Sequence, residues 1–343
     1  MERMKVAVLG ATGVVGQRIV AMLDRHPWFE VTALAASEGS VGAPYGQAVR
    51  GRWHAPGEVP EWAAGLPVVR CVPGVDARIT FCALDANVAG PIEEAFARAG
   101  YLVSSNAKNH RMSRSVPLVI PEVNPEHLSL LAMQGYGPGG IVTNPNCSTT
   151  GIALALAPLH KRFGVSRVVV TTMQSLSGAG YPGVPALAIA GNVIPYIEGE
   201  EEKIEKETVK ILGNGDRPAG FRISAQCNRV GTTVGHLATL AVELERKTSY
   251  EEIADAFTEF RPLTAHDLPT APAAPIALHD DPSRPQPALD VDRGRGMVLT
   301  IGKLRPDPVF DWRFTLLVNN LVRGAAGAAI LNAELLVQQG LAT

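Results

Sequence analysis

The sequence predicts an α/β protein in two parts. Through about residue 105, short apolar runs alternate with helix-like segments, which is typical of a doubly wound, largely parallel sheet. From about residue 167, longer runs with mixed alternation follow one another with fewer helices between them, which favours an α+β region with an antiparallel or mixed sheet. A chain of 343 residues is long enough for two domains with separate cores.

The elements of the first part follow from apolar runs and turn residues. Residues 5–9 form a short apolar run expected as a buried strand, and a helix is expected over 13–25, ending near His26-Pro27. Further strands are expected at 30–35, 78–83 and 101–104, with a loop at 84–87 and a helix at 91–99. Gly100 stands where a glycine commonly ends a helix.

In the second part, strands are expected at 167–173, 233–244, 297–304 and 311–319. The Pro- and Ala-rich stretch 268–287 is expected as a surface excursion, and the segment 262–292 suggests no role. An Ala/Leu-rich helix over 324–339 is expected to pack back on the first part. The first domain would then be discontinuous, with residues 1–146 and 324–343, and the second domain would hold residues 147–323.

Composition narrows the class of protein. A net charge of −2 and 46 % hydrophobic residues fit an ordinary globular protein and give no reason to expect nucleic acid or an anionic membrane as a partner. The four cysteines form no CxxC and no Cys/His cluster, which indicates reduced thiols in the cytoplasm and no metal site. No apolar run is long enough to span a bilayer, and the strand expected at Lys5 leaves no room for a signal peptide.

A glycine motif follows the first strand and opens the first helix. Gly10, Gly13 and Gly16 form G-x-x-G-x-x-G, which allows a tight turn and close approach of a pyrophosphate to a helix N-terminus. The alternative is a plain strand–helix turn, but the context favours a Rossmann-type dinucleotide-binding domain. The cofactor-binding residues expected in this turn are Gly10, Thr12, Gly13, Val14 and Val15.

The end of the second strand bears on the choice of cofactor. An acidic residue there favours the free ribose hydroxyl of NAD, whereas small hydroxyl side chains suit the 2′-phosphate of NADP. The chain has Ser37 and Ser40, with Glu38 between them. NADP is therefore the expected cofactor, bound by Ser37 and Ser40.

Cys147 lies in the motif NPNCSTT, between an Asn-Pro turn and an apolar run expected as a helix. A thiol at a helix N-terminus is expected to favour the nucleophilic thiolate. The alternative is a small buried hydrophobe, which is the interpretation for Cys71, Cys82 and Cys227. A dinucleotide site and an activated cysteine together indicate an aldehyde dehydrogenase or acyl reductase that acts through a thioester.

Three further features are candidates for the same site. His236, at the start of an expected strand, could be a general base, although taken alone it is more often structural. Arg229 could clamp a carboxylate with its planar guanidinium. The charge run over 200–207 lies on an expected helix, where a solvated face with i,i+4 pairs is the default interpretation.

The chain resembles the aspartate-semialdehyde dehydrogenase family, and within it the archaeal and fungal branch. The resemblance runs from Gly10 to Gly327. The segments that carry it are GATGVVGQ at the start, SSNAKNHR at 104–111, VPLVIPEVNPEHL at 116–128, NPNCSTTG at 144–151, QSLSGAG at 174–180, GEEEKIEKETVKILG at 199–213, NRVGTTVGH at 228–236 and NNLVRGAAG at 319–327.

The resemblance implies a reaction. Members of the family reduce L-4-aspartyl phosphate to L-aspartate 4-semialdehyde with NADPH and release phosphate, on the route to lysine, threonine and methionine. Cys147 aligns with the nucleophile that forms a thioacyl enzyme, which hydride converts to a thiohemiacetal. His236 aligns with the acid–base histidine, and Gln174 with a glutamine that orients the substrate.

The resemblance also implies binding roles. The substrate-binding positions are Arg229 for the carboxylate, Arg111 for the phosphate, and Glu200, Lys203 and Asn146 in the same pocket. Ser177, Gly178 and Asn320 align with groups near the nicotinamide. Related proteins often have a basic residue where Gly39 stands, and lysines near Ala43 and Pro44, so the choice of NADP over NAD stays open.

The family is homodimeric, often paired into tetramers, and no metal is implied. Two alternatives to the dehydrogenase remain. A malonyl-CoA or related acyl-CoA reductase would use the same cysteine chemistry on this scaffold. A non-enzymatic paralogue could bind a dinucleotide or act in an assembly, although the nucleophile, base and carboxylate clamp all being present argues against it.

Overall fold

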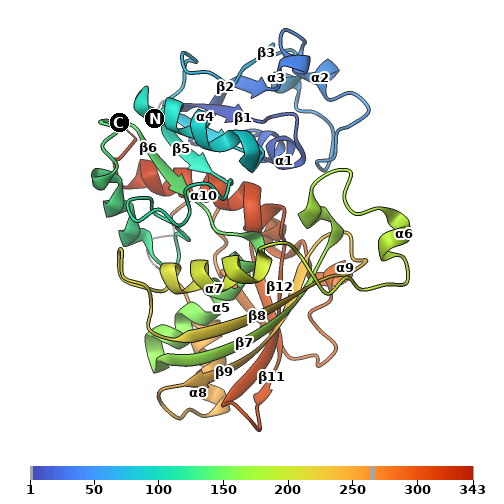
Figure 1. The fold of residues 1–343 in the computed structure, drawn as a ribbon, viewed down its shortest axis with the longest axis vertical. Coiled ribbons are helices and arrows are strands. Elements are labelled where there is room, and N and C mark those ends of the chain that lie inside the picture. Colours follow the sequence, from blue (N-terminus) through green and yellow to red (C-terminus); the bar gives the residue numbers. More distant parts are fainter. Residues whose placement is uncertain (1–2, 263–266, 343) are drawn as a thin grey trace.

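The computed structural model describes residues 3–262 and 267–342. Within these residues the strands form two six-stranded sheets, which lie one above the other in Figure 1. Helices α5 and α10, Cys147–Phe163 and Gly327–Gln338, lie between the regions that the two sheets occupy. The two-part α/β architecture expected from the sequence is confirmed.

The first sheet is entirely parallel, in the order β3-β2-β1-β4-β5-β6. Its strands are β1 (Met4–Leu9), β2 (Phe29–Ala36), β3 (Val68–Arg70), β4 (Ile79–Cys82), β5 (Leu102–Ser105) and β6 (Gly140–Thr143). The first strand and its neighbours lie where the apolar runs predicted them. The short strands β3 and β6 were not predicted, and β6 runs directly into the Cys147 turn.

Of two helices that flank this sheet, one begins where the sequence predicted and the other begins earlier. Helix α1 (Val14–Met22) begins at the glycine turn, as expected. Helix α4 (Ala86–Arg98) begins earlier than the expected 91–99, so part of the expected loop at 84–87 is helical. The reason is the Asp85 side chain, which accepts a hydrogen bond from the Asn87 amide at 2.9 Å and caps the helix.

The C-terminal helix completes the core of the first sheet. Ala326, Ala329 and Ile330 belong to the same buried cluster as Val6 and Val8 of β1. Figure 1 shows α10 next to the first sheet, with the two ends of the drawn chain close together. This packing is what a discontinuous first domain requires, while the boundaries at 146/147 and 323/324 stay a prediction.

A buried ion pair fixes the segment that precedes α10. The guanidinium of Arg323, in the π-helical turn η6 (Val322–Ala326), donates to both carboxylate oxygens of Glu122 at 2.7 and 2.8 Å. Each side chain is about 1 % exposed. Because a buried charge without its partner is costly, this bidentate contact holds η6 against the 116–124 segment.

The second sheet is mixed, as predicted, in the order β10-β11-β12-β9-β7-β8. Its strands are β7 (Val165–Gln174), β8 (Arg222–Arg229), β9 (His236–Leu244), β10 (Ile276–His279), β11 (Leu299–Pro306) and β12 (Trp312–Val318). β7 pairs with β8 in parallel and with β9 in antiparallel orientation.

Two expectations for this region are corrected. The strand expected from residue 233 begins at His236, because Gly235 has φ +97° and breaks the extended conformation. The stretch expected as a surface excursion contains β10, which pairs in parallel with β11, and Leu268 and Ile276 are buried. This segment therefore closes one edge of the second sheet.

Helices cover one face of the second sheet, as Figure 1 shows. They are α5, α7 (Glu200–Ile211) and α8 (Tyr250–Thr258). Helix α8 was not predicted, although Ser249 and Glu252 form a capping box at its start. On strand β7 the burial alternates, and Val169 on the other face of the sheet is 43 % exposed.

Shorter elements lie in the connections. They are the helices α2 (Tyr45–Ala48), α3 (Glu61–Ala64), α6 (Ala186–Ile189) and α9 (Pro287–Asp290), and the 3₁₀ segments η1 (Glu38–Ser40), η2 (Pro125–Met133), η3 (Leu176–Ala179) and η5 (Arg293–Gly296). In the described part of the chain, no helix combines the length and apolar character that crossing a membrane would need.

Candidate active site

The structure places Cys147 at the first residue of helix α5. Strand β6 ends at Thr143, and the Asn144-Pro145-Asn146 turn connects it to the helix. The Asn146 side chain accepts hydrogen bonds from the Ser148 and Thr149 amides at 2.9 and 3.1 Å, which caps the helix. The thiol therefore stands at the helix N-terminus, as the motif predicted.

His236 is the side chain that faces this thiol. Its Nε2 lies 3.2 Å from Cys147 Sγ, and the ring is buried. The Ser175 amide donates to Nδ1 at 3.0 Å. Because a backbone N–H can only donate, Nδ1 must be the acceptor, and the hydrogen of the neutral ring sits on Nε2. The Nε2–H group therefore points at the sulfur.

The sequence predicted a thiolate at Cys147, whereas the structure favours a neutral thiol beside a neutral imidazole. The pKa of His236 is lowered to about 3, mainly by burial; Glu200 opposes this shift and Arg229 contributes to it. The pKa of the Cys147 thiol is raised to about 12, mainly by burial and in smaller part by Glu200. The Ser148 amide, Arg111 and Arg229 favour the thiolate, but their effect is smaller. The helix N-terminus is present, but the effect of desolvation on the thiol pKa is larger than the opposing effect of the helix.

The ends of two parallel strands bring Gln174 and Arg229 to the same place. These residues are register partners at the ends of β7 and β8. Arg229 is 7 % exposed, and its Nη1 donates to the Ser175 carbonyl at 2.7 Å. Gly178 packs tightly here, since a Cβ on it would lie 2.9 Å from both the Arg229 guanidinium and the His236 ring.

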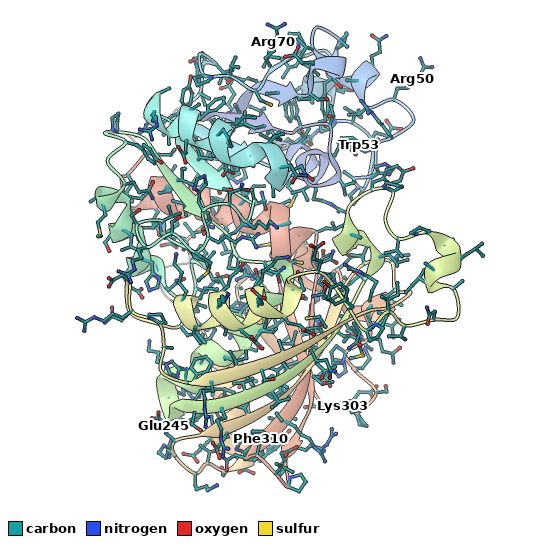
Figure 2. All side chains as sticks on the ribbon, viewed as in Figure 1. Arg50, Trp53, Arg70, Glu245, Lys303 and Phe310 are labelled. Atoms are coloured by element: carbon teal, nitrogen blue, oxygen red, sulfur yellow. The ribbon has the colours of Figure 1, made fainter. Side chains whose placement is uncertain are left out.

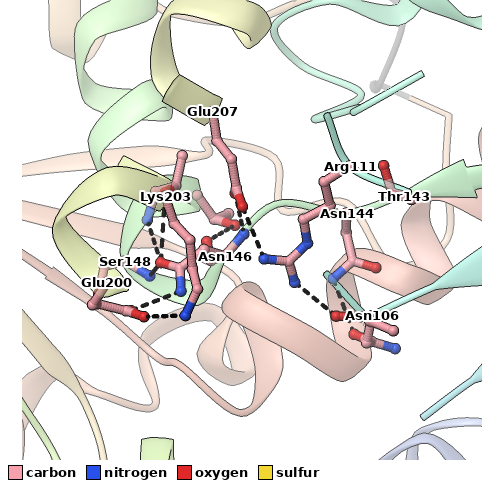
Figure 3. A network of polar contacts seen from close by, with 12 residues as sticks. Asn106, Arg111, Thr143, Asn144, Asn146, Ser148, Glu200, Lys203 and Glu207 are labelled. Carbon is pink, nitrogen blue, oxygen red and sulfur yellow. Dashed lines mark hydrogen bonds and ion pairs between the residues drawn. The ribbon is translucent and has the colours of Figure 1, made fainter. Parts of the chain in front are cut away.

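Helix α7 supplies the acidic side of the site (Figure 3). Glu200 is 5 % exposed and accepts hydrogen bonds from the Asn146 and Gln174 amides at 2.7 and 3.0 Å. Lys203 donates to it at 3.0 Å. These contacts lower the pKa of Glu200 although burial raises it, and Lys203 makes the largest opposing contribution. One face of the charge run is thus buried in the site, contrary to the default interpretation of a solvated face.

Arg111 reaches the same region from the first part of the chain. Its Nη1 donates to Glu207 at 3.1 Å, and its Nη2 donates to the Asn106 carbonyl at 2.7 Å. Its buried Nε has no hydrogen-bond partner among the described residues. Arg111 is held from two sides and also lines the pocket, which suits an arginine that grips an anion.

These side chains surround one pocket of about 310 Å³. Lys108, Arg111, Lys203 and Arg229 all line it, next to Cys147. The other lining residues are Leu84, Ala86, Asn106, Ala107, Asn146, Gln174, Gly178, Ile197 and Glu200. Four cations around one thiol form a pocket suited to a small, multiply charged anion.

The glycine turn is built for close approach of a pyrophosphate. Gly10 has φ +80°, and a Cβ on Gly16 would lie 2.1 Å from the Gly10 carbonyl oxygen. Thr12 and Gly13 complete the turn, and Val14 and Val15 begin helix α1. Ser37 and Ser40 follow β2 around η1. The backbone thus fits the phosphates of a dinucleotide.

Asn320 and Ser177 form a second cluster beside His236. The Asn320 side chain donates to Ser177 Oγ at 2.9 Å and accepts from Ser175 Oγ at 3.1 Å and from the Gly235 amide at 2.9 Å. These contacts fix the loops that carry Ser175 and His236. Gly178 follows in η3, so the three residues expected near the nicotinamide lie together on this side of the thiol.

Some residues of the site were missed at the level of sequence. Glu207 binds Arg111 and the Asn146 amide, and Ser175 fixes the His236 tautomer. Glu207 could have been found, because it lies seven residues after Glu200 and therefore on the same helix face. Ser175 contacts His236 Nδ1 with both its backbone amide and its hydroxyl, but a serine directly after a strand carries no sequence signal of this role. Across residues 3–262 and 267–342, no group of three or more Cys, His, Asp or Glu side chains could hold a metal.

The raised pKa of Cys147 predicts how the thiol reacts. Between pH 7 and 9.5 its alkylation by iodoacetamide should rise about tenfold per pH unit without a plateau, because the thiolate fraction grows at each step below the pKa. Glu200→Gln removes a charge that disfavours the thiolate, so the pKa should fall and alkylation at pH 8 should become faster. Mass spectrometry of the peptide containing Cys147 measures both.

The matched control is Glu202→Gln, at an exposed position of the same helix where the carboxylate pairs with Lys206. This variant should alkylate like the unmodified chain. A plateau below pH 9 in the unmodified chain would contradict the raised pKa.

Comparison with known proteins agrees with this arrangement. The family model of the semialdehyde dehydrogenase NAD-binding domain matches residues 5–131, and that of the semialdehyde dehydrogenase dimerisation domain matches residues 156–323. The aspartate-semialdehyde dehydrogenase of Archaeoglobus fulgidus is 49 % identical, with 98 % of this chain and 99 % of the relative covered. That of Cryptococcus neoformans is 44 % identical, with 99 % of this chain and 98 % of the relative covered.

Solved structures give the same result. The aspartate-semialdehyde dehydrogenase of Candida albicans, solved with NADP, has a TM-score of 0.89 and 39 % identity, with 98 % of this chain and 99 % of that chain covered. An enzyme of the same name from Vibrio cholerae has a TM-score of 0.79 and 28 % identity over the same shares of the two chains. The nucleophile motif, the two matched domains and identity of 44 to 49 % over nearly the full length lead to one conclusion: this chain belongs to the aspartate-semialdehyde dehydrogenase family.

Proposed function

We propose that this chain catalyses the NADPH-dependent reductive dephosphorylation of L-4-aspartyl phosphate to L-aspartate 4-semialdehyde, in the biosynthesis of lysine, threonine and methionine. The observation that carries the proposal is the Cys147–His236 pair at 3.2 Å in a pocket lined by four cations. The substrate has a phosphate and a carboxylate, so a pocket rich in guanidinium and ammonium groups complements it. Membership of the family supports the same reaction.

The charges of the pocket divide between the two ends of the substrate. Arg229, at the end of β8, binds the carboxylate through its planar fork. Arg111 and Lys203, which both line the pocket, bind the phosphate. Glu200, which Asn146 and Gln174 hold, accepts from Lys203. Glu207 accepts from Arg111, and the Ser175 carbonyl accepts from Arg229. The acyl carbon then lies between the two anchors, within reach of Cys147.

The acyl transfer needs no group beyond the substrate, Cys147 and His236. Cys147 Sγ attacks the acyl carbon, the bond to the phosphate oxygen breaks, and the thiol proton leaves with phosphate as HPO₄²⁻. Nε2–H of His236 donates to the sulfur and so stabilises thiolate when the thioester forms and when it breaks. The fixed tautomer supports this donor role for the neutral ring. When bound, NADPH supplies the hydride that reduces the thioester.

The alternatives receive no support from the comparisons. The relatives and solved structures described above are aspartate-semialdehyde dehydrogenases, so an acyl-CoA reductase is not proposed. A non-enzymatic paralogue would not need Cys147, His236, Arg229 and Arg111 to meet at one pocket.

The reverse reaction tests the proposed function. With L-aspartate 4-semialdehyde and NADP⁺, the chain should form NADPH only when phosphate is present, as measured by absorbance. Cys147→Ala should abolish this turnover, because no other cysteine and no serine of the described chain lines the pocket, while the Kd for NADP⁺ should change less than twofold. Turnover by the alanine variant would disprove the thioester route, and turnover that does not depend on phosphate would disprove the phosphorylating reaction.

The choice of NADP over NAD has a structural basis that the sequence did not reveal. Arg52 Nη2 lies 3.4 Å from Ser40 Oγ, where the second strand leads into η1. Gln17 of α1 holds this loop, since its side chain donates to the Arg52 and Thr12 carbonyls at 2.9 and 2.8 Å. Related proteins often have a basic residue where this chain has Gly39. We infer that Arg52 supplies the positive charge instead, and that it binds the 2′-phosphate together with Ser37 and Ser40.

Glu38 does not oppose this assignment. Arg70 Nε contacts its carboxylate at 3.2 Å, so part of the negative charge near the ribose site is compensated. Both side chains are exposed, which makes this a weak surface pair. Figure 2 shows Arg70 and Arg50 at the outer edge of the first part of the molecule.

Replacing Arg52 tests this assignment by binding alone. Arg52→Ala should raise the Kd for NADP⁺ about tenfold, because a charge-assisted hydrogen bond contributes about 1.5–3 kcal/mol and exposure reduces this. The Kd for NAD⁺ should stay within twofold. Isothermal titration calorimetry measures both, with Arg50→Ala as control on the same loop. Equal effects of the two variants on NADP⁺ would refute a specific role for Arg52.

A homodimer is the proposed assembly, with pairing into tetramers left open. The family model that matches residues 156–323 describes a dimerisation domain. On that part of the chain the face of the second sheet opposite α5 and α7 carries exposed Val169 and a shallow groove of about 310 Å³ beside Thr171, Thr239 and Arg313. An apolar side chain exposed on a broad sheet face supports burial against a second copy.

A charge on this face should separate the subunits. Val169→Asp should shift the chain from dimer to monomer in sedimentation equilibrium, because a buried carboxylate without a partner is costly. Val72→Asp, at an exposed valine of the first part, should leave the dimer intact. A monomeric unmodified chain, or an unchanged dimer with Val169→Asp, would rule out this face.

We also propose that the enzyme acts in the cytoplasm. The four cysteines are all free, and free thiols are typical of a reducing compartment. Fractionation of cells that express the chain would test this.

A further inference from the structure

Glu207 joins the two halves of the substrate pocket. Its Oε1 accepts from Arg111 Nη1 at 3.1 Å, and its Oε2 accepts from the Asn146 amide at 2.7 Å. Figure 3 shows the carboxylate between these two groups. Asn146 directly precedes Cys147, so a single carboxylate contacts both the turn of the nucleophile and an arginine of the anion pocket. It is 2 % exposed and does not line the pocket itself.

Lys210 holds the other side of the Arg111 segment. It lies one helical turn after Glu207 and is 8 % exposed. Its Nζ donates to the carbonyls of Arg111, Ser113 and Val116 at 2.5, 2.8 and 2.9 Å. An ammonium has three donors, and here all three are used on consecutive parts of one loop. The loop that carries Arg111 is thus fixed at its backbone by Lys210 and at its guanidinium by Glu207.

The two contacts leave Arg111 with little freedom. The second guanidinium nitrogen is held by the Asn106 carbonyl, so both terminal nitrogens of Arg111 are anchored. A long side chain that is already ordered loses less entropy when it binds an anion. Misplacement of a reacting group by about 1 Å can lower the rate about a hundredfold. An Arg111 side chain that is already in position therefore favours the reaction.

We propose that Glu207 and Lys210 are positioning residues that set where the phosphate group sits relative to the Cys147 sulfur. Lys210 fixes the backbone position of the Arg111 loop, and Glu207 links the Arg111 guanidinium to the turn before Cys147. Neither residue touches the substrate. The inference rests on the proposed function for the identity of the anion, since it assigns Arg111 to phosphate.

The two residues make different contacts, so their variants should differ. Lys210→Met removes the hold on the Arg111 loop and keeps both hydrogen bonds of Glu207, and it should raise the KM for phosphate in the reverse reaction at least tenfold while kcat changes less than threefold. Glu207→Gln has one acceptor and one donor in place of two acceptors, so either Arg111 or the Asn146 amide loses its partner. It should raise the KM for phosphate and also lower kcat at least tenfold. The KM for the semialdehyde should stay within threefold in both.

Glu202→Gln is the matched control, because Glu202 lies on the exposed face of α7 and pairs with Lys206. It should leave all three constants unchanged. Circular dichroism and the Kd for NADP⁺ report whether each variant is folded. If Lys210→Met does not fold, Lys210→Arg keeps the charge but not the fit to three carbonyls, and it should show the same selective rise in the KM for phosphate.

A binding measurement separates this inference from the proposed reaction. Inorganic phosphate should slow the iodoacetamide alkylation of Cys147, and the phosphate concentration for half protection should rise at least tenfold in Lys210→Met and in Glu207→Gln. If the unmodified chain shows protection but no phosphate-dependent turnover, the proposed reaction fails while the positioning role stands. Unchanged half protection in both variants would overturn the positioning role.

Discussion

The site depends on the burial of two carboxylates on one helix. Glu200 and Glu207 both lie in the interior, and a buried carboxylate without a partner costs several kcal/mol. Their partners come from three separate segments: Arg111 after β5, Asn146 before α5, and Gln174 at the end of β7. Satisfying these charges therefore requires the first sheet, the cysteine turn and the second sheet to meet. The same contacts that remove the electrostatic penalty assemble the pocket.

Much of this arrangement could be predicted because its signals are local. The glycine turn, the Cys147 turn and the long strands each have a residue pattern of their own, and the family resemblance added Gln174, Arg229 and Arg111. Strands β8 and β10 were missed because packing against distant segments, rather than a local pattern, decides their conformation. Helix α8 was missed although it has a local signal, the Ser249–Glu252 capping box. The segment around β10 looked like a loop from its prolines, yet its parallel pairing with β11 is a long-range contact.

The protonation of the thiol shows a second limit of local reasoning. A helix N-terminus favours thiolate, and that feature is present at Cys147. The pKa is nevertheless raised, because burial depends on every segment that surrounds the sulfur and Glu200 reaches it from another helix. The sequence also indicated no cation that would suit a 2′-phosphate. Arg52 lies twelve residues after Ser40, and only the fold around Gln17 brings the two together.

The return of α10 to the first sheet has a consequence for how the chain is made. Ala326, Ala329 and Ile330 complete the core around Val6 and Val8, yet they follow these strand residues in the chain only after the whole second sheet. During translation the strands of the first sheet leave the ribosome long before the helix that covers one of their faces. The second sheet, whose strands are contained between residues 165 and 318, can reach its final packing first. The nascent chain must keep an apolar sheet surface from aggregating until α10 has left the ribosome.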